Sequence, residues 1–375
     1  HYLIGYELRN RYILQNSLLS PNYTSQELFV RSTDINRTLQ SAYSQLQGLY
    51  PEETGPSLHE LSLQASAVPP IKVSNLTSIE ASLGSAALPN FLQAAPVHTD
   101  ALTRDLLLLP DFNCPYASEI INSGVNDQQE AAYYRAYPYV IETIQKFFEI
   151  DYDDAVETFE PLYDSLVANS FSGFPTPSIF DDKFMQQSQE LHAKLFRLYY
   201  SNPTILPQIL ATPYMMLLKE ALTEASSNNT EVKFLFLSAH DSTLMIYNIG
   251  LQLNSTAFPS FASTLITELH LIDQQFFVRM LFNDRSVVVP TCAQVMCPLH
   301  DFMGYLDSRV IPNIQQVCAS QALVPSNYFP VYASIASLSL SVVGIVLLVL
   351  LGKNQQSSIL PLPDNIDCYH FKAML

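Results

Sequence analysis

The chain has 375 residues with 18 Lys and Arg against 35 Asp and Glu, so its formal net charge is -17. This balance excludes a protein that binds nucleic acid by neutralising phosphates with a basic surface. Hydrophobic residues make up 48% of the chain, which is too many for a disordered protein and enough for one large core or two smaller ones. Any anionic substrate must therefore be bound by a few local cations.

The first predicted unit is a strand, a turn and a helix between residues 27 and 49. The strand covers residues 27–30 and ends at Arg31, and Thr33 or Asp34 is the predicted cap of the helix. One face of that helix carries apolar residues at helical spacing, namely Ile35, Leu39, Ala42, Leu46 and Leu49.

The middle of the chain has helical composition over residues 126–149, 184–200 and 214–226, which predicts a helical insertion. A second strand-turn-helix unit follows, with a strand at 233–237, a turn at 238–243 and a helix at 244–253. Two β-rich runs, 265–272 and 276–282, are separated by residues 273–275 and predict a hairpin.

The two strand-turn-helix units carry the candidate site residues. In open α/β sheets, ligands bind at the carboxyl ends of the strands, where helix N-termini present free N–H groups. Arg31 and His240 stand at those ends, and Asp241 follows as a candidate proton donor. The alternatives are that Arg31 pairs with one of many carboxylates and that Asp34 and Asp241 are plain helix N-caps. Spacing alone favours the alternatives.

Residues 331–351 contain no charged side chain and are long enough to cross a bilayer, which predicts one transmembrane helix. Lys353 and a short polar tail, residues 352–375, follow it. The alternative of a buried core helix is disfavoured because the segment has no polar face. We therefore predict a single-pass protein with its N-terminal part lumenal or extracellular and its tail in the cytoplasm.

Glycosylation sequons and cysteines agree with that orientation. The predicted glycosylation sites are Asn22, Asn75, Asn228 and Asn254, while Asn36, close to Arg31, is expected to stay unmodified. Four cysteines precede the apolar segment and Cys368 lies alone in the tail, which indicates two disulfides in the lumenal part. The cysteine spacing is unlike that of a zinc ribbon.

Residues 30–39 (VRSTDINRTL) and 238–243 (SAHDST) closely resemble two signature stretches of the histidine acid phosphatases. The resemblance extends through residues 1–12, 96–99, 113–115, 265–271 and 297–299, and so covers most of the first 320 residues. With a membrane segment added, the sequence is most similar to the lysosomal and prostatic branch of that family.

The resemblance implies an α/β fold, a mainly parallel doubly wound sheet with an inserted, mostly helical second domain. The core would comprise residues 1–80 and 230–325, and the helical cap residues 81–229. The family hydrolyses phosphomonoesters through a phosphohistidine and uses no metal or cofactor. A homodimer, a lysosomal or cell-surface location and the disulfides Cys114–Cys318 and Cys292–Cys297 are also implied.

The roles implied for single residues follow from the two motifs. Arg31 would bind the substrate phosphate, His240 would be the second, phosphate-binding histidine, and Asp241 would protonate the leaving group. Arg37, in the first motif, is interpreted as structural.

One departure from the family concerns the nucleophile, because the motif Arg-His-Gly-x-Arg-x-Pro is absent from the 375 residues. The chain begins with His and shows no signal-peptide pattern, so we interpret it as a mature form or a fragment whose first core strand lies upstream. We expect the polypeptide alone to have no phosphatase activity. The alternative is a non-catalytic, membrane-anchored binding ectodomain on the same scaffold.

Overall fold

The computed structural model describes residues 1–58, 70–124, 127–201, 205–227, 229–253 and 258–319. The chain divides into two compact units. The first comprises His1–Cys114, Pro207–Ser255 and Pro259–Cys318, and the second is built on Pro115–Leu206. The predicted transmembrane segment, 331–351, and the tail, 352–375, lie outside the described residues. Within the described ranges, no helix combines the length and the hydropathy that crossing a membrane requires.

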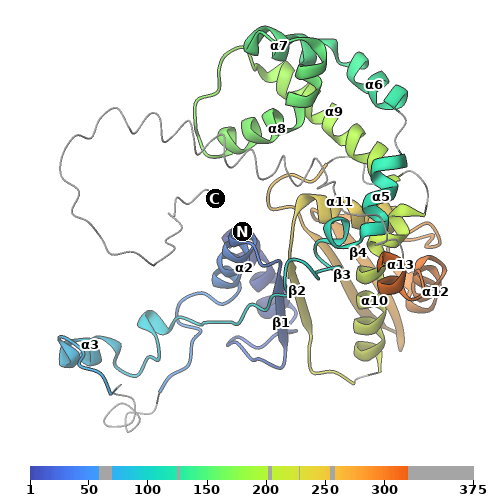
Figure 1. Ribbon diagram of the computed structural model, residues 1–375. Coiled ribbons are helices and arrows are strands. Elements are labelled where there is room, and N and C mark those ends of the chain that lie inside the picture. The colour runs from blue at the N-terminus through green and yellow to red at the C-terminus, as the bar shows by residue number, and fades with distance from the viewer. Residues whose placement is uncertain (59–69, 125–126, 202–204, 228, 254–257, 320–375) are drawn as a thin grey trace, which may run out of the picture. The chain divides into compact units, whose positions relative to one another are not determined.

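A parallel strand pair forms the centre of the first unit (Figure 1). Strand β1 (Leu28–Ser32) pairs with β2 (Phe234–Ser238), so that Arg31 lies opposite Leu237 and Ser32 opposite Ser238. On the other side of β1, the His98 N–H donates to the Val30 carbonyl at 2.9 Å, and the Ser32 N–H donates to the His98 carbonyl at 2.8 Å. The strand of the first predicted unit is therefore confirmed and is bordered on both sides.

Three helical segments cover this strand pair. Helix α1 (Tyr2–Arg9) continues as the π-helix η1 (Asn10–Gln15) and packs closely on α2 (Asn36–Leu49). Gly5 and Gly48 allow the close approach, because a Cβ on either would overlap backbone atoms of the opposite helix. The buried side chains of this core are Leu8, Tyr12, Ile13, Leu19, Leu28, Val30, Ala42, Leu46, Leu49, Tyr50 and Ala95.

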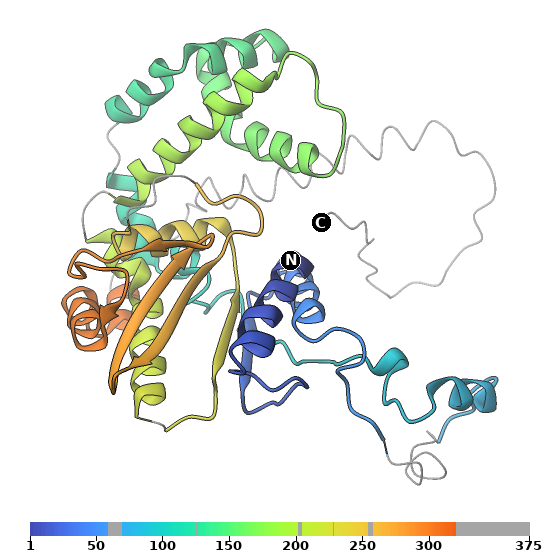
Figure 2. The same cartoon turned by 180° about the vertical axis from the view of Figure 1, so that it is seen from behind.

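The remaining strands form an antiparallel sheet (Figure 2). Strand β3 (Leu265–Ile272) pairs with β4 (Gln275–Phe282), which also pairs with β5 (Arg285–Val287) and β6 (Cys297–Pro298). The turn between β3 and β4 has positive φ at both Asp273 and Gln274, as tight hairpins require. The predicted hairpin is thus confirmed. The expectation of a mainly parallel sheet is wrong for the described residues, because strands joined by such short turns can only run antiparallel.

The first unit contains further helices. They are α3 (Leu76–Leu83), η3 (Pro89–Phe91), α4 (Pro110–Asn113), α10 (Leu206–Ser226), α11 (Asp241–Gly250), α12 (Leu299–Arg309) and α13 (Ile314–Ala319). Helices α10 and α11 touch closely, since the rings of Tyr214 and Tyr247 stack with their centroids 4.0 Å apart and Gly250 faces Ala211. Helix α11 begins three residues before its predicted start at residue 244.

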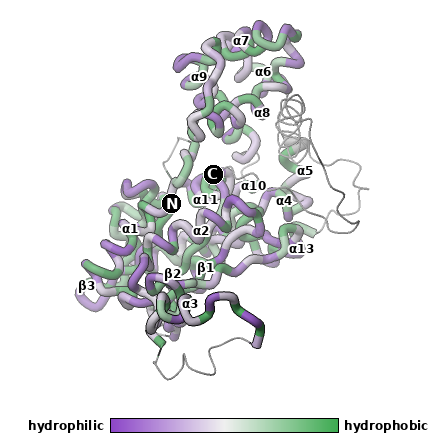
Figure 3. The backbone as a smooth tube through the Cα atoms, turned by 90° about the vertical axis from the view of Figure 1, so that its left-hand side faces the viewer, coloured by the Kyte–Doolittle hydropathy of each residue, from purple (hydrophilic) through white to green (hydrophobic). Residues whose placement is uncertain are grey.

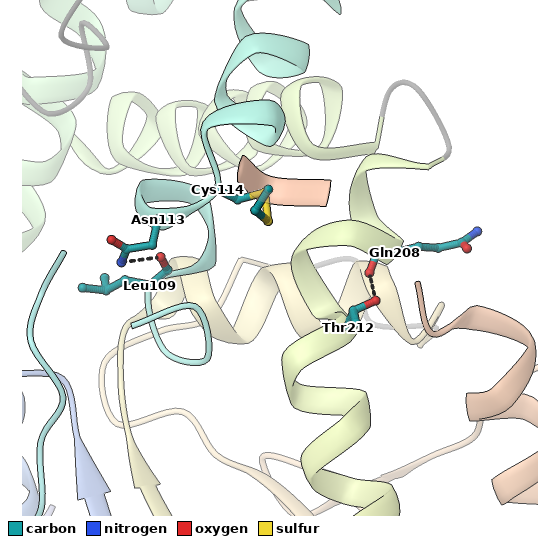
Figure 4. The surroundings of a disulfide bond; sticks show 6 residues. Leu109, Asn113, Cys114, Gln208 and Thr212 are labelled. Carbon is teal, nitrogen blue, oxygen red and sulfur yellow. Dashed lines mark hydrogen bonds between the residues drawn. A yellow bond between two sulfur atoms is a disulfide. The ribbon is translucent and has the colours of Figure 1, made fainter. Parts of the chain in front are cut away.

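Both implied disulfides are present. Cys114, at the end of α4, is bonded to Cys318 in α13, and Cys292 is bonded to Cys297. Around Cys114, the Asn113 side-chain amide donates to the Leu109 carbonyl at 3.1 Å, and the Thr212 hydroxyl donates to the Gln208 carbonyl at 2.7 Å (Figure 4). The first disulfide closes a sequence separation of 204 residues and so joins distant parts of the first unit.

The second unit is helical, as the sequence predicted for this region. It contains α5 (Pro115–Gly124), α6 (Asp127–Ala136), α7 (Pro138–Phe148), α8 (Tyr152–Phe171) and α9 (Asp182–Ser201). Hydrophobic and hydrophilic residues alternate along α7 and α9 (Figure 3). Hydrophobic residues of α7, α8 and α9 form a separate core that includes Val140, Ile144, Phe159, Phe184 and Leu191. Pro138 begins α7, which explains why the predicted helix at 126–149 is two helices.

The borders of the units differ from the expected ones. The sequence predicts residues 81–114 and 207–229 in the helical cap, but they belong to the first unit. The first segment is held there because His98 pairs with β1 and Asp105 bonds to Arg31 at 2.6 Å. The second is held because α10 packs on α11.

Candidate active site

The parallel register brings the ends of β1 and β2 together. Because Ser32 lies opposite Ser238, the residues after both strands emerge at the same edge of the pair. The Thr33 N–H donates to the Ser238 carbonyl at 3.1 Å, and the Ser238 hydroxyl donates to the Thr38 carbonyl at 2.8 Å. The two motifs, 207 residues apart between Thr33 and His240, therefore meet at one place.

His240 lies between two side chains of the first motif. Its Nε2 is 3.2 Å from the Thr33 hydroxyl, and its Nδ1 is 3.2 Å from Nη2 of Arg37. Burial and then the positive charge of Arg37 lower the pKa of His240 from 6.5 to about 4. The imidazole is therefore neutral above about pH 5, even though it belongs to a site proposed for an anion.

Arg31 is held by an ion pair at the end of β1. Its Nη2 is 2.6 Å from Oδ1 of Asp105 and 3.8 Å from Oδ2 of Asp100. Asp105 is fully buried, and its Oδ1 also accepts the Leu108 N–H at 2.9 Å. The alternative of a carboxylate pair for Arg31 is therefore correct, but the Arg31 side chain stays 23% exposed and can still donate to a ligand.

Asp241 is the first residue of α11 and its side chain is exposed. Its Oδ1 accepts the Ser242 N–H at 2.7 Å. The N-cap positions of α11 and α2 are His240 and Ile35, and neither makes a side-chain cap hydrogen bond. The predicted caps Thr33, Asp34 and Asp241 are thus wrong, and neither N-cap residue covers its helix N-terminus, although the Ser242 N–H of α11 is already bonded to Asp241.

Three residues of the site have roles that were not predicted from the sequence. Arg37 was interpreted as structural, yet its guanidinium contacts His240. Thr33 was expected to cap a helix, but its hydroxyl contacts Thr38 at 2.6 Å and His240. Asp105 lies 74 residues from Arg31, so no local pattern connects the two. Within the described ranges, no three His, Cys, Asp or Glu side chains are grouped as a metal site would need.

Residues 1–283 match the model of the family described as histidine phosphatase superfamily (branch 2). The chain belongs to this superfamily. Prostatic acid phosphatase of Rattus norvegicus is 26% identical over 342 residues, which cover 88% of this chain and 79% of the rat protein. Lysosomal acid phosphatase of Xenopus laevis is 26% identical over 381 residues, covering 95% of this chain and 77% of the frog protein. The resemblance drawn from the motifs is confirmed.

Solved structures show the same fold. The phytase of Citrobacter braakii has a TM-score of 0.55 at 16% identity and covers 84% of this chain and 87% of its own. The phytase of Hafnia alvei has a TM-score of 0.55 at 14% identity and covers 84% of this chain and 86% of its own. At this identity the likeness concerns the architecture, a mixed α/β histidine phosphatase fold.

Proposed function

We propose that this chain carries the phosphate-binding and proton-donating half of an acid phosphatase active site that hydrolyses phosphomonoesters. The observation that supports the proposal most strongly is the meeting of Arg31, His240 and Asp241 at the ends of two paired parallel strands. Two helix N-termini without side-chain caps begin at the same edge and favour an anion.

Each residue has a distinct role in the proposed reaction. The exposed part of the Arg31 guanidinium donates to the phosphate oxygens, and the neutral His240 donates one further hydrogen bond. Asp241, in its protonated form, gives its proton to the leaving oxygen as the ester P–O bond breaks. Its exposed position gives it access to that oxygen, and an acidic medium keeps a carboxyl protonated.

The phosphohistidine route also needs a nucleophile, and no Arg-His-Gly-x-Arg-x-Pro motif occurs in the 375 residues. We propose that the nucleophile is supplied by residues outside this sequence. The same absence favours the second candidate, a binding ectodomain without catalysis. Reading the transcript upstream of the His1 codon separates the two, because only the enzyme requires the motif there.

Phosphate binding tests the site directly in the 375-residue chain. We expect inorganic phosphate to bind, and Arg31→Gln to weaken it about 10- to 100-fold, because a hydrogen bond to a charged group contributes about 1.5–3 kcal/mol. Arg285→Gln, which removes an exposed charge from β5, is the matched control and should have no effect. Equal affinity in Arg31→Gln and wild type, with unchanged circular dichroism, would contradict the proposal.

We further propose that the site faces the lysosomal lumen or the cell exterior, with residues 331–351 as the membrane anchor and the homodimer of the family as the assembly. The two disulfides of the first unit support an oxidising compartment. Of the proposed glycosylation sites, Asn22 and Asn75 are exposed, whereas Asn228 and Asn254 lie outside the described residues. Mass spectrometry of the glycopeptides tests this topology.

A further inference from the structure

Residues 105–109 form a short turn, the brace turn, that contacts both halves of the proposed site. Oδ1 of Asp105 accepts from Nη2 of Arg31 at 2.6 Å and from the Leu108 N–H at 2.9 Å. The Leu109 N–H donates to the Asp105 carbonyl at 3.0 Å, which closes the turn. Asp105 and Leu108 are fully buried. The Arg31 side chain is therefore fixed to the brace turn as well as to its own strand.

The first two turns of α11 donate hydrogen bonds to the same brace turn. Thr243, the third residue of the helix, donates its hydroxyl to the Leu108 carbonyl at 2.8 Å. The Tyr247 hydroxyl donates to the carbonyl of Leu107, and both donor side chains are buried. Because residues four apart lie on one face of a helix, the two bonds fix the rotation of α11 about its axis as well as its position.

Neither donor has a competing role within the helix. Threonine hydroxyls in helices commonly bond the carbonyl four residues earlier, but for Thr243 that residue is Ala239, which precedes α11. Burial, and then the neighbours Tyr214 and Asp105, raise the pKa of Tyr247 well above its ordinary value. The phenol therefore keeps its proton and donates at acidic and neutral pH, while its ring stays stacked on Tyr214.

We propose that Thr243 and Tyr247 are positioning residues that hold the N-terminus of α11 at a fixed place relative to Arg31. The connection runs from the guanidinium through the brace turn to the helix that begins at Asp241, the proposed proton donor. A displacement of about 1 Å between such groups can lower a rate about 100-fold. The inference rests on the proposed function, because it concerns how the two halves of that site are held together.

Hydrogen exchange measured by mass spectrometry tests the connection without a ligand. Thr243→Val and Tyr247→Phe each remove one hydroxyl and keep nearly the same shape. We expect exchange about 2- to 10-fold faster in peptides covering residues 99–114 and 238–250, the loss of one neutral hydrogen bond. Thr243→Ser, which keeps the hydroxyl, should restore the wild-type rates. Thr143→Val is the matched control, since Thr143 is also buried and donates to a carbonyl, at 2.6 Å, but lies in α7 of the second unit.

Affinity for inorganic phosphate separates a positioning role from a merely structural one. A loss of stability elsewhere leaves the affinity of the folded chain unchanged, whereas a displaced α11 should weaken it about 3- to 10-fold in Thr243→Val. Asp105→Asn disturbs the other end of the same connection, so Thr243→Val should weaken binding little further in that background. Thr143→Val should leave the affinity unchanged in both backgrounds.

The two measurements also distinguish this proposal from the proposed function. Unchanged exchange of residues 99–114 in a folded Thr243→Val would overturn the proposal. So would an unchanged phosphate affinity in that variant, or losses that add in full to those of Asp105→Asn. Absent phosphate binding in every chain, with the expected changes in exchange, would contradict only the proposed function.

Discussion

Asp105 is the buried partner of Arg31, and replacing it tests how the phosphate-binding arginine is held. Its carboxylate is fully buried, bonds to Arg31 at 2.6 Å and accepts the Leu108 N–H at 2.9 Å. Breaking a buried ion pair from one side costs about 3–5 kcal/mol. Because Arg31 is 23% exposed and Asp100 lies 3.8 Å away, we expect Asp105→Ala to destabilise this region by about 2–4 kcal/mol.

Asp105→Asn removes the negative charge of the side chain but keeps nearly the same side-chain shape. The amide oxygen can still accept the Leu108 N–H, so we expect a smaller cost of about 1.5–3 kcal/mol, that of a hydrogen bond to a charged group. Asp100→Asn is the control, since Asp100 is 41% exposed and its pair with Arg31 is long. An exposed pair of this kind contributes about 1 kcal/mol or less.

The assay has to be local, because two compact units need not unfold together. The chain also contains no tryptophan that could report on unfolding. Hydrogen exchange measured by mass spectrometry, on peptides that cover β1 and residues 99–114, gives the opening free energy where the ion pair lies. Equal protection from hydrogen exchange in Asp105→Ala and Asp100→Asn would refute the argument, because it would mean that the buried carboxylate does not stabilise this region.

Three further predictions concern the rest of the first unit. The pKa of His240 is about 4 in the folded chain, below the value of 6.5 in the unfolded chain, so the free energy of unfolding should fall by up to about 3 kcal/mol as the pH falls from 6.5 to 4. His240→Gln should reduce this decline, measured by urea unfolding followed by circular dichroism. An unchanged dependence on pH would contradict the prediction. Gly48→Ala should push α1 away from α2, because the added Cβ would overlap the Tyr2 carbonyl, and should lower the free energy of unfolding by about 1–3 kcal/mol. Gly304→Ala should have little effect, because nothing lies within 4 Å of a Cβ there. Replacing Cys114 and Cys318 by Ser should lower stability by about 2–5 kcal/mol, measured as a lower melting temperature than wild type without reducing agent. Because Cys292–Cys297 remains in the variant, reducing agent should lower its melting temperature less than that of wild type.

Local patterns in the sequence predict the two strand-turn-helix units and the hairpin. The strands β1 and β2 are short apolar runs, and α2 has apolar residues at the spacing of a buried helix face, so each element can be predicted from residues close together in the sequence. The parallel pairing of β1 with β2 is not local, but it follows once Arg31 and His240 are assigned to one site through the family motifs. The parallel sheet was overestimated because alternation of strands and helices does not reveal how the later strands connect.

The contacts that shape the site could not be predicted in the same way. Asp105 occurs in an ordinary stretch between residues 99 and 109, and only the fold brings it to Arg31. The cap residues were misassigned for a related reason, since Thr33 has the composition of a helix cap but its hydroxyl forms bonds to Thr38 and His240. Preference for a position is a local property, whereas the partner of a polar group depends on tertiary contacts.

The charges around the site explain how an acidic protein can hold an anion. The charge of Arg31 is largely compensated by Asp105 and Asp100, and His240 is neutral above about pH 5. Arg37, in contrast, has no carboxylate within ion-pair distance among the described residues. Within that part of the chain, the uncompensated cation beside the phosphate site is therefore Arg37, supported by the N-termini of α2 and α11. The chain as a whole repels anions, since its net charge is -17. Removing the positive charge of Arg37 should therefore weaken phosphate binding, and the loss should be largest at low ionic strength because salt screens exposed charges.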